Sequence, residues 1–386
     1  MLMTPGLALF YGGMVRGKNV LGTLMQSFVA IALISVQWIL VGYSLSFGPD
    51  INGIIGSLDW IGLRGVGIEP NPDYAPTIPH MAFMIYQAMF AVITPALITG
   101  AFAERMKFSA YLLFILLWST LVYDPVAHWI WGTGGWLKKM GALDFAGGIV
   151  VHLISGISAL AAALIIGRRK GYLQEAMYPH NLPMTVLGAG LLWFGWFGFN
   201  AGSALSAGTL STMAFVATHT SAVSATLIWV IIEWIHRGKP TMFGAATGSI
   251  AGLATITPAS GFVSPMSALI IGLAAGAICY VSLNMKTKLG YDDSLDAFGV
   301  HGVGGFVGTF ATGIFASTLI NPAGSNGLLF GSHQLFVSQM TAMAVTAVYS
   351  FIATVILLKI IDKFIGLRID QESELHGLDI SQHGET

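Results

Sequence analysis

Long runs of apolar residues, separated by short polar segments, dominate this chain. A helix needs about 20 residues to cross the roughly 30 Å hydrocarbon core of a bilayer. Measured against that length, the pattern predicts eleven membrane-spanning helices, of which the first is too short to cross alone. The expected spans are residues 1–15, 20–46, 80–103, 109–131, 145–167, 183–203, 213–236, 241–257, 263–284, 297–319 and 332–360.

Basic residues agree with this pattern because nearly all of them fall in alternate loops. Cytoplasmic loops of membrane proteins carry an excess of Lys and Arg. The alternation therefore predicts an odd number of spans, an N-terminus outside the cell and a C-terminus in the cytoplasm. Only Arg64, Lys138 and Lys139 lie on the expected outer side, whereas the inner side has Arg16, Lys18, Arg105, Lys107, Arg168, Arg169, Lys170, Arg237, Lys239, Lys286, Lys288, Lys359, Lys363 and Arg368.

The composition is that of an all-α polytopic membrane protein. Of the 386 residues, 55% are hydrophobic and only 9% are charged, whereas soluble domains carry about 25% charged residues. The net charge of −1 indicates no nucleic-acid partner, and the single Cys279 excludes a disulfide framework. The 48 glycines suit close packing of helices in lipid.

Two histidines, His152 and His301, lie inside apolar runs, each a few residues after a Leu-Asp pair. An ionisable side chain within a membrane span is costly and marks a functional site by default. Each histidine could simply satisfy a hydrogen bond in the core. Because an imidazole accepts on one nitrogen and donates on the other, two in series could instead pass a small hydrogen-bonding solute, or a proton. A metal site is a weaker option, because zinc needs three or four ligands and no further ligand has obvious spacing.

The histidines also suggest an internal repeat, since they fall in the fifth and tenth expected spans. Two five-span halves, residues 1–170 and 183–319, would be inverted relative to each other in the membrane. Such repeats place their site at the interface between the halves, near the midplane. The last helix, 332–360, then stands outside the repeat within a membrane domain covering 1–362. A cytoplasmic tail, 363–386, follows it.

Asp144 and Asp296 lie at or near the starts of the two histidine-bearing spans. These positions favour N-caps, in which a carboxylate accepts hydrogen bonds from free backbone N–H groups. Asp144 could also help a cation at the outer mouth. Five aromatic residues lie near the ends or middles of expected spans, namely Tyr86, Phe90, Trp131, Trp196 and Phe199. They could form an interfacial belt, or they could form a cation–π cage for a small ammonium ion.

Several short motifs follow one another along essentially the whole chain. They are residues 6–19 (GLALFYGGMVRGKN), 103–105 (AER), 127–132 (AHWIWG), 141–148 (GALDFAGG) leading to His152, 179–183 (PHNLP), 195–203 (GWFGFNAGS) and 296–302 (DAFGVHG). Together they resemble the ammonium transporter family (Amt/Mep/Rh), in particular its bacterial and archaeal Amt branch. The resemblance implies eleven transmembrane helices with an inverted five-plus-five repeat and a final helix. It also implies a homotrimer in the plasma membrane, the inner membrane of the cell, with one pore per subunit.

The resemblance further implies how the outer end of the pore is built. Trp131, Phe90 and Ser203 would form the outer ammonium site, with two ring faces and a hydroxyl that accepts a hydrogen bond. Phe90 and Phe199 would be a stacked gate below it. Asp144 would support the vestibule and assist recruitment of the ion without touching it.

Deeper in the pore, His152 and His301 would be the twin histidines of the family. Ammonium would lose its proton, ammonia would pass between these histidines, and the proton would cross separately with the pair as relay. Tyr86, Trp196 and Thr247 would lie in the pore or its vestibule. The family handles ammonium and its analogue methylammonium, uses no cofactor and is not a family of enzymes.

The tail from Gly366 resembles the regulatory tail of the family, which can contact PII signal proteins. Two residues depart from the usual pattern. Tyr86 stands where many members have Phe, and Asp124 stands where relatives are commonly apolar. We expect Asp124 either in the outer headgroup zone or near the vestibule, where it would add negative potential.

A second functional class is an ammonium sensor that binds the ion and signals through a fused domain or a partner. The short first helix and the end at Thr386 would suit a domain cut from a longer protein. A domain encoded after residue 386 would favour the sensor, and uptake of methylammonium would favour the transporter. An intramembrane enzyme has little support, because no nucleophile–base pair or metal-ligand cluster is evident.

Overall fold

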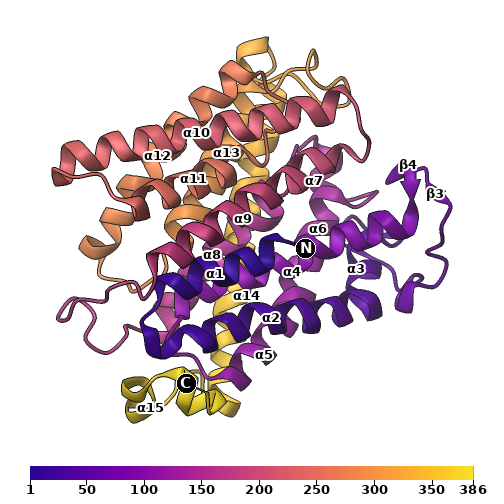
Figure 1. Cartoon of the computed structure of the whole chain (residues 1–386). Helices are drawn as coiled ribbons and strands as arrows, with labels where there is room; N and C mark the ends of the chain where they lie inside the picture. Colours follow the sequence, from indigo (N-terminus) through magenta and orange to yellow (C-terminus); the bar gives the residue numbers. More distant parts are fainter. Residues whose placement is uncertain (386) are drawn as a thin grey trace.

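The computed structural model describes residues 1–385 as a bundle of helices that run side by side (Figure 1). Among these residues, nine helices are long and apolar enough to span a membrane. They are Gly17–Phe47 (α2 and α3), His80–Phe102 (α4), Phe108–Met140 (α5 to α7), Gly148–Ile166 (α8), Leu182–Ala204 (α9), Thr209–Arg237 (α10), Pro265–Leu289 (α12), Phe298–Phe315 (α13) and His333–Ile365 (α14). The prediction of a polytopic, all-helical membrane protein is confirmed.

Two further helices are shorter. These are α1 (Met3–Met14) and α11 (Met242–Ile256). They occupy two of the expected spans, but neither reaches about 20 residues, so the count of eleven spans stays a prediction. The segment between Phe47 and His80 is not helical throughout, because it contains two small antiparallel sheets. Their strands are β1 (Asp50–Ile51) with β2 (Ile55–Gly56), and β3 (Pro70–Asn71) with β4 (Ala75–Pro79).

Helix ends follow ordinary sequence signals. The side chains of Asn181, Thr241 and Ser264 each accept a hydrogen bond from the backbone N–H three residues on, at the starts of α9 (Leu182–Asn200), α11 and α12. Gly238 and Gly290 end α10 and α12 in the left-handed conformation, which glycine adopts without steric cost. These local signals explain why the long apolar runs break where they do.

Several spans are composite, because a π-helical turn interrupts the regular helix. The turns are η2 (Trp38–Gly42) between α2 (Val20–Gln37) and α3 (Tyr43–Phe47), η4 (Ser119–Tyr123) between α5 (Phe108–Trp118) and α6 (Asp124–Trp131), η5 (Gly148–Leu153) before α8 (Ile154–Ile166), and η7 (Phe298–Gly302) before α13 (Val303–Phe315). Such turns occur frequently at functional sites. Here η5 carries His152 and η7 carries His301.

The expected halves meet through equivalent spans. Helix α1 packs against α9, the first span of each half, while α8 packs against η7 and α13 against η5, the fifth spans. The backbones come very close at this crossing. A Cβ on Gly156 would overlap the backbone of Gly302, and one on Gly305 would lie 2.7 Å from the backbone nitrogen of Leu153. The missing side chains therefore allow the crossing that brings the two histidine turns together.

The polar tail folds back on one end of the bundle, where it forms α15 (Gln371–His376) and the turn η9 (Asp379–His383), and η9 packs against α2 (Figure 1). Helix α14 ends at Ile365, so the expected tail begins within its last turn. Asn19 accepts a hydrogen bond from the backbone of Leu378 at 2.9 Å, and the Asp379 carboxylate accepts one from the backbone of Gly22 at 2.8 Å. The tail is therefore hydrogen-bonded to the helix bundle and covers the start of α2.

A buried ion cluster lies at the same end of the bundle. Arg169 pairs with Asp292 at 2.8 Å and with Glu104 at 3.3 Å, and Arg16 pairs with Glu104 at 2.7 Å. Burial alone would raise the pKa of both carboxyls. The guanidinium of Arg169, joined at Glu104 by that of Arg16, instead holds each pKa below its usual value. The cluster joins loops from the two expected halves, since Asp292 precedes η7 and Glu104 follows α4 (His80–Phe102).

Candidate functional site

The two histidines lie face to face at the crossing of the π-helical turns. Their ring centroids are 5.2 Å apart and the ring planes differ by 17°. His152 is 1% exposed and His301 is 3% exposed. Two residues far apart in the sequence are therefore stacked in the interior, as the repeat of the local pattern predicts.

The hydrogen bonding of the pair decides between the interpretations of these histidines. Both ring nitrogens of His152, and Nδ1 of His301, are buried with no hydrogen-bond partner among the described residues. Buried polar groups in native proteins are normally satisfied, so a purely structural core hydrogen bond does not explain His152. These ring nitrogens can therefore donate hydrogen bonds to, or accept them from, a molecule in the space beside the pair.

That space is a small cavity with an otherwise almost entirely apolar lining. Its wall comes from α1, α4, α9 and α11 around the two imidazoles and consists of Met3, Leu7, Phe10, Ile93, Leu97, His152, Leu192, Trp196, Phe199, Ile250 and His301. Trp196 stacks on His152 with ring centroids 5.2 Å apart, and its Nε1 donates to the Thr257 hydroxyl at 2.9 Å. Trp196 is thus part of the histidine cavity.

An aromatic cluster lies directly beyond this cavity, with Phe90 of α4 at its centre. Phe90 and Phe199 are stacked, with ring centroids 4.1 Å apart and an angle of 23° between the planes. Phe199 in turn lies 6.3 Å from His152, measured between ring centroids. On its other sides Phe90 meets the ring of Trp131 edge-on at 5.5 Å and that of Tyr86 at 5.1 Å. A continuous row of rings therefore connects the outer cluster to the histidine pair.

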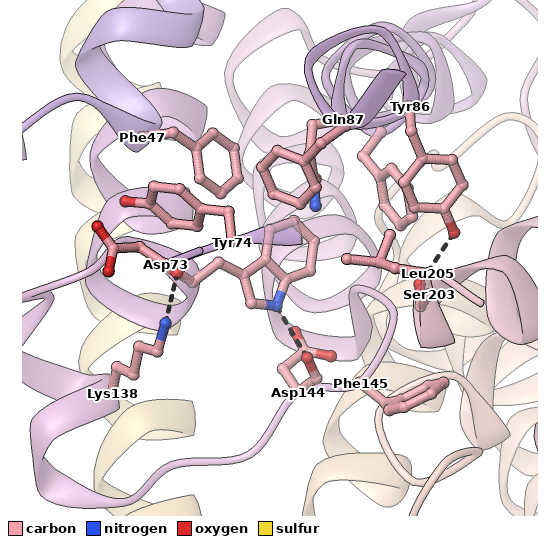
Figure 2. A pocket seen from close by; sticks show the side chains of 13 residues that line it. Phe47, Asp73, Tyr74, Tyr86, Gln87, Lys138, Asp144, Phe145, Ser203 and Leu205 are labelled. Carbon is pink, nitrogen blue, oxygen red and sulfur yellow. Dashed lines mark hydrogen bonds between the residues drawn. The ribbon is translucent and has the colours of Figure 1, made fainter. Parts of the chain in front are cut away.

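The outer cluster lines an open pocket of about 170 Å³ (Figure 2). Ser203, in the turn η6 (Ala201–Ala204), lines this pocket together with Trp131, Phe90 and Tyr86. The Ser203 hydroxyl donates to the backbone oxygen of Phe199 at 2.9 Å and lies 3.0 Å from the Tyr86 hydroxyl. The Tyr86 hydroxyl also donates to the Phe199 oxygen, at 2.7 Å, so the tyrosine and the serine share one backbone acceptor.

Trp131 is the last residue of α6, and the loop that follows holds its ring. The indole Nε1 donates to the backbone oxygen of Asp144 at 2.8 Å (Figure 2). The Asp144 carboxylate accepts four backbone hydrogen bonds from the start of η5. The donors are Gly147 at 2.8 Å, Gly148 at 2.7 Å, Ile149 at 2.8 Å and Val150 at 3.0 Å. One residue therefore couples the outer tryptophan to the turn that carries His152.

The expectation that Asp296 caps the second histidine turn is wrong. The cap is Asp293, whose carboxylate accepts hydrogen bonds from Ala297 at 3.1 Å and Phe298 at 2.8 Å. Asp296 instead has a left-handed backbone and pairs with Lys286. Equal spacing would have identified the cap, because Asp144 and Asp293 each stand eight residues before a histidine.

Asp124 lies inside the protein, and its expected placement in the outer headgroup zone or near the vestibule stays a prediction. It is fully buried between α6 and α3, accepting hydrogen bonds from Gln37 Nε2 at 2.7 Å and the Ser46 hydroxyl at 3.3 Å. It does not line the outer pocket. Gln37, whose Nε2 also donates to Thr120 at 3.2 Å, was not anticipated as its partner. An intramembrane amide facing an intramembrane acid is the signal that would have linked the two.

Thr247, which the resemblance places in the pore or its vestibule, lines neither the outer pocket nor the histidine cavity. Its hydroxyl donates to the backbone oxygen of Phe243 at 2.9 Å within α11. Ile250, three residues later, lines the histidine cavity, but Thr247 does not. Within residues 1–385, no group of three or more His, Cys, Asp and Glu side chains is arranged to hold a metal ion.

Comparisons with known proteins agree with this architecture. The Ammonium Transporter Family model matches residues 1–386. An ammonium transporter of Bacillus subtilis (strain 168) is 54% identical over 385 residues, covering 100% of this chain and 94% of the relative. The crystal structure of Saccharomyces cerevisiae Mep2 has a TM-score of 0.90 at 37% identity, covering 96% of this chain and 87% of that one.

A structure titled "Sensor Amt Protein" has the same TM-score of 0.90 at 30% identity, covering 99% of this chain and 95% of that one. Transporter-named and sensor-named proteins therefore share this fold. The matched family is one of membrane transporters and not of enzymes. The chain is a multi-pass membrane protein and belongs to the ammonium transporter family.

Proposed function

We propose that this protein transports ammonium across the plasma membrane by way of the aromatic cluster and the histidine pair. The observation that carries the proposal is the row of rings from Trp131 through Phe90 and Phe199 to His152, which ends on imidazole nitrogens without partners. The match to the family over residues 1–386 supports the substrate.

Recruitment takes place at the outer pocket. The ring faces of Trp131 and Phe90 attract a small cation through their π electrons, an interaction worth about 0.5–2 kcal/mol, and the Ser203 oxygen accepts a hydrogen bond from it. Potassium has similar charge and size but cannot donate that bond. The Asp144 oxygens already accept hydrogen bonds from backbone N–H groups, so they do not contact the ion. The negative charge of Asp144 attracts the ion from a distance.

Passage requires the stacked rings of Phe90 and Phe199 to separate, since they close the way to the histidine cavity. A charged ion entering that apolar cavity would lose its water, which strongly disfavours the charged form. Ammonium therefore gives up a proton, and the neutral ammonia that remains passes along His152 and His301, hydrogen-bonded to their free nitrogens. The proton crosses separately with the imidazole pair as relay, and ammonium forms again on the far side.

The remaining residues support this path. Tyr86 shares the Phe199 backbone acceptor with Ser203, and Trp196 packs against His152 as part of the cavity wall. Thr247, buried in α11, contributes through packing of that helix. The protein acts as a homotrimer with one pore in each subunit, its N-terminus outside and its tail in the cytoplasm, where the tail can contact a PII signal protein.

A sensor function is the second candidate, and the likeness to a structure titled "Sensor Amt Protein" is the observation that favours it. A sensor would bind ammonium at the same outer pocket but would conduct little. Transport by the purified chain in lipid, without any other protein, separates the two functions.

The test is uptake of labelled methylammonium by proteoliposomes that contain the purified protein, with excess potassium or ammonium as competitor. We expect uptake that ammonium inhibits and potassium does not. Phe199→Ala should alter uptake, whereas Phe197→Ala should leave it unchanged. Phe197 is a matched control because it lies on the same helix but stacks on Phe215, with ring centroids 3.9 Å apart. Absence of uptake despite binding would favour the sensor.

A further inference from the structure

A lysine side chain enters the outer pocket, among the groups proposed to recruit ammonium. Lys138, from α7 (Trp136–Met140), lines the pocket together with Trp131, Phe90 and Ser203. Its amino group donates to the backbone oxygen of Trp131 at 3.0 Å and lies 5.9 Å from the centre of the Tyr74 ring. Figure 2 shows the end of Lys138 directed into the pocket beside Asp73 and Tyr74.

The chemistry of this lysine matches that of the proposed substrate. A protonated lysine ends in an alkylammonium group, and methylammonium is the smallest member of that class. Here the group is held by an oxygen acceptor and lies near an aromatic ring, the same two kinds of contact that the pocket offers an ammonium ion. The pocket therefore already contains one tethered ion of the substrate class.

The neighbouring lysine does not share this position. Lys139 is 64% exposed at its side chain, pairs with Asp50 at 3.5 Å and does not line the pocket. The charged side chains that do line it are Asp73, Asp144 and Lys138. Among the described residues that line the pocket, Lys138 is therefore the one with a positively charged side chain.

We propose that Lys138 acts as a tethered competitor, which lowers the affinity of the outer pocket for alkylammonium and ammonium ions. The inference rests on the proposed function, since it assigns a regulatory residue to the same site. A positive charge within a Debye length, about 8 Å at physiological ionic strength, repels a second cation. The effective dielectric constant at the pocket lies between those of a protein surface and water. Removal of the Lys138 charge should therefore strengthen binding of an ammonium or alkylammonium ion roughly threefold to tenfold.

The test compares Lys138→Met and Lys138→Gln with Lys139→Met as the matched control. Half-saturation by methylammonium is measured in proteoliposome uptake, and binding to detergent-solubilised protein is measured by quenching of tryptophan fluorescence. Both Lys138 variants should reach half-saturation at roughly threefold to tenfold lower concentration. The Lys139 variant should match the wild type, and the difference should shrink at high ionic strength because salt screens the charge.

Two results would overturn the proposal. One is an unchanged or higher half-saturation concentration in both Lys138 variants. The other is a change in Lys138→Met alone, since glutamine keeps a donor for the Trp131 oxygen and the lysine would then only position that tryptophan. Binding that shifts as expected, without uptake by the wild type, would refute transport but support the role of Lys138.

Discussion

Replacing Asp144 by alanine should weaken the fold and the transport path together. The substitution removes the acceptor for four backbone N–H groups at the start of η5, the turn that carries His152. A buried donor left without a partner costs about 1–3 kcal/mol. If water from the adjoining pocket satisfies two of the four, the loss is about 2–6 kcal/mol. Asp144→Asn should lose less, because its one amide oxygen can keep two of the bonds.

The assay is thermal unfolding in detergent, followed by tryptophan fluorescence at one fixed heating rate, since unfolding of such proteins is often irreversible. Asp73→Asn is the matched control, because Asp73 lines the same pocket but is exposed. If Asp144 acted only through its charge, Asp144→Ala and Asp73→Asn would both weaken uptake, and neither would unfold at a lower temperature than the wild type. Unfolding of Asp144→Ala at the wild-type temperature would refute the reasoning.

Three further predictions concern the surrounding structure. Gly156→Leu should prevent assembly of the two halves, because even a Cβ there overlaps the backbone of Gly302; size-exclusion chromatography of the purified protein would show aggregation, and a normal monodisperse profile would contradict the crossing. Asp124→Asn should keep the wild-type thermal stability, whereas Asp124→Ala, which deprives Gln37 and Ser46 of their acceptor, should lose about 1–3 kcal/mol; equal stability of the two variants would be the contrary result. The contribution of Glu104 to stability should be constant at neutral pH and be lost on acidification below about pH 4, because the pKa of Glu104 is lower in the folded state than in the unfolded chain. In unfolding scans across pH, Glu104→Gln should be less stable at neutral pH and should lose less on acidification, and an identical pH profile would refute this.

Some of the site could be predicted from the sequence, because its residues carry strong signals. A histidine inside an apolar run is unusual by itself, and the repeated pattern around His152 and His301 links the two. Their stacking depends on the crossing at Gly156 and Gly302. That contact is between residues far apart in the chain, so no local pattern shows it. The repeat predicts that the histidines approach each other, whereas the packing determines their distance and angle.

Other parts escaped sequence reasoning for physical reasons. The expectation that Asp296 caps the second histidine turn followed the Leu-Asp pair. The turn begins at Phe298, and the carboxylate that reaches its first backbone N–H groups is that of Asp293. Lys138 looks like an ordinary surface lysine, since its neighbour Lys139 is one. Which of two adjacent lysines enters a pocket depends on the direction of a short helix, α7, and composition carries no information about that direction.

The central claim is that ammonia and its proton both use the histidine pair. The most direct measurement is the current across a lipid bilayer containing the purified protein, under an ammonium gradient and with potassium as control. The wild type should carry a current with ammonium and none with potassium. Replacement of His152 and His301 together by leucine should abolish the ammonium current, because the leucines can neither accept nor donate the proton. An unchanged ammonium-dependent current in the double variant would contradict the account.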